Sequence, residues 1–226
     1  MKTLKKHLLT AGLFCVVLAL PCRSAAASPG QSVHLTFKGL TADASFDNVD
    51  PTGCIETSVS ITATNGTIKT VNVIGGPQAS SSALVSLSQF DFCTLTVLLD
   101  AFSTPVPLSL AAGAFQINTK LNSATLNTSA DVFDTVSGNT FSVQVIITWA
   151  GTGGIPTAFR DMFVMRGPGV RINRSAFAIT FDPATASGSV VIPGGTNLTP
   201  GPSDSADLES VKSGDLTLCT TTAPCD

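Results

Sequence analysis

The sequence predicts an all-β fold: an antiparallel β-sandwich, immunoglobulin-like or jelly-roll-like, in a single disulfide-supported domain. Three observations lead to this prediction. Apolar and polar residues alternate along several runs, turn residues separate those runs at short intervals, and no run of a dozen residues has a helical period. Many short alternating strands with such punctuation are typical of sandwiches and related folds.

The alternating runs place every second side chain on one face. A strand with this pattern buries one face in a core and leaves the other in water. Trp149 has the parity of its apolar neighbours, so we expect it in the core and not on a sugar-binding surface. The apolar positions are Val33, Leu35, Phe37; Val59, Ile61, Ala63; Phe141, Val143, Val145, Ile147, Trp149; and Phe177, Ile179, Phe181.

Turn residues lie between the runs. Asp50-Pro51-Thr52-Gly53 fits a type I turn, and Asn65-Gly66 is a strong two-residue hairpin signal. Gly167-Pro168-Gly169 predicts a further hairpin turn. At most a short helix is expected, near Ala79 to Leu87.

The first 27 residues predict a secretory signal peptide, which leaves residues 28–226 as the folded domain. Lys2, Lys5 and Lys6 precede an apolar stretch of thirteen residues, and small residues follow with an Ala25-x-Ala27 cleavage spacing. A Cys22 lipid anchor is the alternative, but Leu20 and Pro21 stand where small residues are required. No later apolar run is long enough for a membrane span. We therefore expect a secreted, extracellular protein.

Composition and charge exclude several functions. Only 12% of residues are charged. Removing the signal peptide leaves eight cations against fifteen acids, a net charge of −7. Such a protein repels polyanions as a whole, so nucleic acid is not an expected partner. No cofactor is predicted, and the sequence does not specify an oligomeric state.

Four cysteines remain after export. An even number in a secreted chain predicts two disulfides, with three possible connectivities. We favour Cys54–Cys93 and Cys219–Cys225. A zinc site is not expected, because no closely spaced ligand pair such as C-x-x-C is present.

The residues required for common catalytic mechanisms are scarce. His34 is the one histidine after the signal peptide, its parity places it beside Thr36 and Lys38, and no G-x-S-x-G motif occurs. Only Glu56 and Glu209 are glutamates, although a pair of carboxylates could still meet in the fold. We therefore expect no enzyme activity, with an extracellular hydrolase using paired carboxylates as the alternative.

Two side-chain groups are candidate binding sites. Asp43, Asp47, Asn48 and Asp50 precede a turn and offer oxygen ligands for calcium. Their spacing does not match a D-x-D-x-D-G loop, and Asp and Asn favour turns without a metal, which is the interpretation we prefer.

The second group is basic. Arg160, Arg166, Arg171 and Arg174 flank the predicted Gly167-Pro168-Gly169 turn. Guanidinium groups bind carboxylates and phosphates, so this hairpin is a candidate patch for an acidic glycan or envelope polymer. The simpler alternative, which we favour, is that these arginines pair with Asp161 and Asp182.

Several motifs resemble a group of uncharacterised secreted bacterial proteins. The resemblance covers most of the mature chain and implies export and a single domain, but no activity. Members of the group often carry a His-rich strand after the Trp segment. Here that region reads Arg160-Asp161-Met162-Phe163-Val164-Met165 and contains no histidine, so the resemblance does not imply a histidine metal site in this chain. The matching stretches are Val49-Asp50-Pro51-Thr52-Gly53-Cys54, Gln89-Phe90-Asp91-Phe92-Cys93, Lys120-Leu121-Asn122-Ser123-Ala124-Thr125-Leu126, Gly195-Thr196-Asn197-Leu198-Thr199-Pro200 and Ser210-Val211-Lys212-Ser213-Gly214-Asp215.

The function predicted from sequence is therefore a secreted, non-catalytic β-protein that binds an extracellular or envelope polymer or forms part of a matrix.

Overall fold

The computed structural model describes residues 32–71, 78–153, 157–166, 172–194, 196–202 and 204–218. Twelve antiparallel strands account for the regular structure in these ranges, which confirms the all-β prediction. The strands are β1 Ser32–Val49, β2 Ile55–Val71, β3 Gln78–Asp91, β4 Thr96–Ser103, β5 Leu108–Ser109, β6 Phe115–Ile117, β7 Ser123–Asp134, β8 Thr140–Gly151, β9 Thr157–Arg166, β10 Ile172–Val191, β11 Asn197–Leu198 and β12 Ser205–Leu218. No helix in these ranges could span a membrane.

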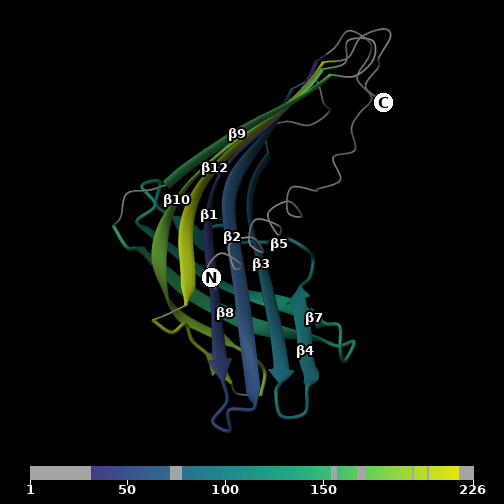
Figure 1. Cartoon of the computed structure of the whole chain (residues 1–226), viewed down its shortest axis with the longest axis vertical. Coiled ribbons are helices and arrows are strands. Elements are labelled where there is room, and N and C mark those ends of the chain that lie inside the picture. Colours follow the sequence, from purple (N-terminus) through teal and green to yellow (C-terminus); the bar gives the residue numbers. More distant parts are fainter. Residues whose placement is uncertain are drawn as a thin grey trace.

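All twelve strands belong to one sheet. Neighbours follow the order β11-β10-β12-β1-β2-β3-β4-β7-β6, while β5 pairs with β3 and β9 with β10. Strand β8 pairs with both β10 and β7, so the sheet closes on itself. Its two layers are therefore halves of one sheet, with β7 and β8 crossing behind β1, β2 and β3 (Figure 1).

The core fills the closed part of the sheet, which we call the body. Alternate residues of β2, β3, β7 and β8 point inward, as expected for half-buried strands. On β8 the predicted apolar residues Val143, Val145, Ile147 and Trp149 are buried, whereas Phe141 is only partly buried against the core. Val59, Ile61 and Ala63 on β2 are buried as predicted. On β1 the core residues are instead Ala42, Ala44 and Phe46.

Trp149 joins the two layers, as its parity predicted. Its side chain is fully buried, and its indole Nε1–H donates to the carbonyl oxygen of Asp43 at 2.8 Å. The ring of Phe115 meets the indole edge-on, with centroids 6.5 Å apart. A buried indole with a satisfied N–H is the arrangement that a stable core requires.

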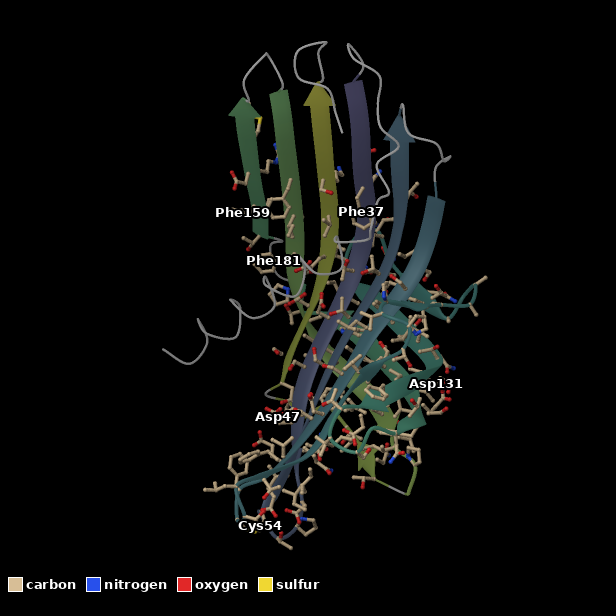
Figure 2. All side chains as sticks on the ribbon, turned by 90° about the vertical axis from the view of Figure 1, so that its right-hand side faces the viewer. Phe37, Asp47, Cys54, Asp131, Phe159 and Phe181 are labelled. Atoms are coloured by element: carbon tan, nitrogen blue, oxygen red, sulfur yellow. A yellow bond between two sulfur atoms is a disulfide. The ribbon has the colours of Figure 1, made fainter. Side chains whose placement is uncertain are left out.

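Six strands continue beyond the body as a single layer, which we call the extension. It consists of β9 and of residues 172–181, 210–218, 32–40, 65–71 and 78–82 of β10, β12, β1, β2 and β3 (Figures 1 and 2). Phe37, Phe177, Ile179 and Phe181 lie here, on the face opposite to the one that continues into the core. The expectation that they line the main core is therefore wrong, because β1 and β10 turn their even-numbered positions inward within the body.

Two local predictions also differ from the structure. Asn65-Gly66 forms no hairpin turn: it lies inside β2, where Leu40 pairs with Asn65 and Gly39 with Gly66. Residues 79–87 are part of β3 and not a helix. By contrast, the Asp50–Gly53 turn forms as predicted. Gly53 has a φ of 76°, and its N–H donates to the Asp50 carbonyl oxygen at 3.0 Å.

Candidate functional site: a cationic groove on the extension

A shallow groove follows β10 along one face of the extension, between β9 and β12. Its floor contains the small residues Ala176, Ala178 and Thr180, so the flanking strands form its sides. Arg160 and Met162 line one side, and Ser210, Lys212 and Gly214 line the other.

The strand register places three cations in one row across this face. Ala178 is directly opposite Arg160 on β9 and directly opposite Lys212 on β12, and Lys212 is opposite Lys38 on β1. Directly opposite residues of antiparallel strands point to the same face. We call Lys38, Lys212 and Arg160 the cationic row.

The spacing of the row follows from the sheet. Adjacent strands lie ~4.8 Å apart, so the backbones at Lys212 and Arg160 are roughly 10 Å apart across Ala178. The methyl group of Ala178 leaves room between two long side chains, and all three cations of the row are exposed. An anion seated over Ala178 can therefore be reached from both sides, and Arg160 contributes a forked guanidinium suited to carboxylate, sulfate or phosphate.

Two aspartates lie near the groove. Strand alternation places the Asp161 side chain on the other face of β9, although this residue also lines the groove, and places Asp182 on the groove face of β10. Asp161 is opposite Phe177, and its carboxylate accepts a hydrogen bond from the N–H of Met162 at 2.7 Å. Asp182 is buried at the junction with the body. Within the described residues, no ion pair joins either aspartate to Arg160. The pairing that we favoured for the arginines is therefore not seen at Arg160.

The predicted arginine patch is only partly described. Arg160 lies in the groove, whereas Arg166 and Arg174 occupy positions on β9 and β10 and their side chains fall outside the described part. Arg171 lies outside the described residues. Sequence reasoning missed Lys38 and Lys212, which are far from Arg160 in the chain and reach it only through strand pairing.

A second cluster, of three carboxylates, lies on the opposite face where the extension meets the body. Asp43 on β1 is directly opposite Asp207 on β12, Glu209 is two residues further along β12, and oxygen atoms of the three carboxyl groups lie within 4.8 Å of one another. Thr62 on β2 donates its hydroxyl to Asp43 Oδ1. We call these three residues the acidic cluster.

Burial dominates the electrostatics of the acidic cluster. It raises the pKa of Asp43 well above its usual range, and the charges of Asp207 and Glu209 raise that pKa further, against the Thr62 hydrogen bond. Burial and then the charge of Asp207 raise the pKa of Glu209 to about 7. Like charges brought together in a poorly solvated site keep protons that they would lose in water.

The predicted calcium ligands are not brought together as a group. Asp43 belongs to the acidic cluster, and Asp47 lies further along β1, exposed and opposite Ser58. Asp50 caps its turn: its carboxylate accepts the hydroxyl of Thr52 at 2.7 Å and the N–H groups of Cys54 and Ile55. These hydrogen bonds, chiefly that from Thr52, lower the pKa of Asp50.

The cysteines agree with the sequence prediction where the structure describes them. Cys54, in the turn between β1 and β2, forms a disulfide with Cys93, in the turn after β3. Cys54 is labelled in Figure 2. Cys219 and Cys225 lie outside the described residues. Asp91 lies beside this bond, and its carboxylate accepts the Cys93 N–H at 2.8 Å.

The hydrolase alternative requires carboxylates that face a substrate. The three carboxylates of the acidic cluster do meet, but none of them lines the groove. Comparisons of the chain with protein-family models, curated proteins and solved structures found no match.

Proposed function

We propose that this protein is exported and binds an acidic extracellular polymer, such as an acidic glycan, in the groove between Arg160 and Lys212. One observation carries the proposal: the register brings Lys38, Lys212 and Arg160 into one row on a single face of the extension. The Cys54–Cys93 disulfide supports export, because disulfides form and persist in oxidising compartments outside the cytosol.

The groove is positively charged, whereas the chain as a whole is negatively charged. The mature chain is expected to carry −7, and a negative protein repels a polyanion at long range. At physiological salt, however, charges separated by more than about 8 Å are largely screened. A polymer at the groove therefore interacts mainly with the cationic row, while the acidic cluster lies on the opposite face.

The shape of the groove suits a chain more than an isolated ion. The floor from Ala176 to Thr180 extends roughly 15 Å along β10 at the strand rise of ~3.3 Å per residue. A polymer can lie on this small-residue floor and present one acidic group between Arg160 and Lys212. Repeated acidic groups then add affinity through successive contacts.

The test is retention on immobilised dextran sulfate and on immobilised polygalacturonate. The double substitution Arg160→Ala/Lys212→Ala is expected to elute at clearly lower salt than the wild type. Lys120→Ala is the matched control, because Lys120 is an exposed cation of the body, away from the groove. Equal elution of the double variant and the wild type on both matrices would refute the proposed function.

A further inference from the structure

Strand β9 forms an open edge of the extension. Its ten residues pair with β10 without a register shift, from Thr157 opposite Phe181 to Arg166 opposite Ile172. Among the described strands, β10 is the only one that pairs with β9. The other side of β9 therefore carries backbone N–H and C=O groups that no described strand takes up, which makes β9 a template for another strand.

Natural proteins usually block such an edge, and β9 lacks several of the usual devices although it carries charged residues. It has no proline, no lysine and no bulge along its length. Three of its apolar side chains remain about half exposed: Phe159 at 55%, Met162 at 57% and Val164 at 47%. In the described part of the chain, β8 closes the body by pairing with both β10 and β7, whereas β9 remains an open edge of the extension.

We infer that β9 pairs antiparallel with β9 of a second copy of this chain, which joins two extensions into one continuous sheet. An antiparallel pair of identical strands is related by a two-fold axis, so each copy uses the same surface and the assembly closes at a dimer. Every backbone group at the edge then gains the partner that an antiparallel ladder supplies.

The charges of β9 select the register. An axis at Asp161 would place two Asp161 carboxylates directly opposite each other, and like charges in that position are destabilising. An axis at Met162 instead places the two Met162 side chains opposite each other and Arg160 opposite Val164 of the second copy. This register keeps like charges out of direct opposition and uses residues 158–166 of β9.

The dimer has a consequence for the groove. A two-fold axis perpendicular to the sheet leaves both copies facing the same way, so both cationic rows lie on one continuous face. Two grooves side by side can bind one polymer at two places, which raises the apparent affinity without any new contact. The inference does not depend on the proposed function, because a dimer can form whether or not a polyanion binds.

Sedimentation velocity of the purified full chain over a wide concentration range tests the inference. The wild type is expected to shift from monomer to dimer as its concentration rises. Met162→Lys places two ammonium groups opposite each other at the axis and is expected to remain monomeric, with dimer partly restored at high salt. Ile146→Lys is the matched control: it introduces the same charge on the body, at a β8 position that is 46% exposed, and should dimerise like the wild type.

A second variant tests the β9–β9 dimer if Met162→Lys misfolds. Met162→Cys brings two thiols to directly opposite positions, where Cα atoms are ~4.5–5.5 Å apart, within disulfide range. Mild oxidation is expected to give a cross-linked dimer, whereas Ile146→Cys should give none. A wild type that is monomeric at every concentration, an open series of larger species, or a Met162→Cys variant that does not cross-link would overturn the inference.

Discussion

The ring of Phe37 lies directly over Gly66 on the neighbouring strand. A Cβ built at Gly66 would come within 2.5 Å of Phe37 Cε2, and one built at Gly39 would come within 2.5 Å of Phe37 Cζ. Gly39 and Gly66 are paired in the β1–β2 ladder, and Phe37 is only 8% exposed. The ring thus fills the space that two missing side chains leave in the middle of the sheet, a known way for an aromatic residue to compensate for strand glycines.

Gly66→Ala is therefore expected to destabilise the protein. The added methyl group overlaps the Phe37 ring, and overpacking of this kind costs about 1–3 kcal/mol. Gly214→Ala is the control, since a Cβ there meets only Thr36 Cγ2, at 3.7 Å, and should leave stability nearly unchanged. Urea unfolding measures both. In the Phe37→Ala background the cost of Gly66→Ala should shrink, and an unchanged cost would show that the ring is not the cause.

Trp149→Phe should weaken the link between the layers. It removes the N–H that donates to the Asp43 carbonyl and shrinks a fully buried side chain. The lost hydrogen bond contributes about 0.5–1.5 kcal/mol, and the smaller ring leaves a cavity as well. The free energy of unfolding from urea titration should fall by at least this amount. A fall within experimental error would argue against the indole bond.

Stability should decrease as the pH rises from about 4.5 to about 7. The pKa of Glu209 is about 7 in the folded protein against 4.5 as its ordinary value, so in this window the folded state keeps a proton that the unfolded chain has released. The free energy of unfolding then falls as the pH rises, by up to about 3 kcal/mol from this group. Asp43 acts in the same direction, because its pKa is also raised.

The variant Glu209→Gln tests this assignment. It removes the buried negative charge, so it should be more stable than the wild type at pH 8 and should differ little from it at pH 4. Thermal unfolding at a series of pH values gives the comparison. Parallel pH profiles of the two proteins would contradict a proton held by Glu209.

Reduction of the Cys54–Cys93 disulfide should lower stability. The bond closes a loop with a sequence separation of 39, and the chain-entropy model assigns roughly 4 kcal/mol to a loop of that length. The double variant Cys54→Ser/Cys93→Ser should show this loss in urea unfolding. A change below 1 kcal/mol in that experiment would count against the pair as a stabilising cross-link.

The sequence pattern correctly predicted those features that depend only on residues close together in the chain. Alternation identified the strands and the buried Trp149, and Asp50-Pro51-Thr52-Gly53 identified a turn because its hydrogen bonds are internal. The same logic failed at Asn65-Gly66. The glycine there is required by a ring from another strand, and no local rule contains that ring.

The groove shows the same limit at longer range. The sequence identified Arg160 through its arginine neighbours, but Lys38 and Lys212 join it only because β1, β12, β10 and β9 are adjacent. Asp43 was grouped with Asp47 and Asp50, its neighbours in the chain, whereas pairing places it with Asp207 and Glu209. Register, which long-range packing decides, determines which charges share a face.

The most direct test of the central claim moves one charge across the sheet. Lys212→Ser/Ser213→Lys keeps composition and net charge but transfers the cation to the opposite face of β12, since successive side chains alternate. Calorimetric titration with polygalacturonate at low salt is predicted to show a loss of affinity as large as that of Lys212→Ala, while circular dichroism confirms an unchanged fold. Wild-type affinity in the exchanged variant would contradict a binding site built from the cationic row.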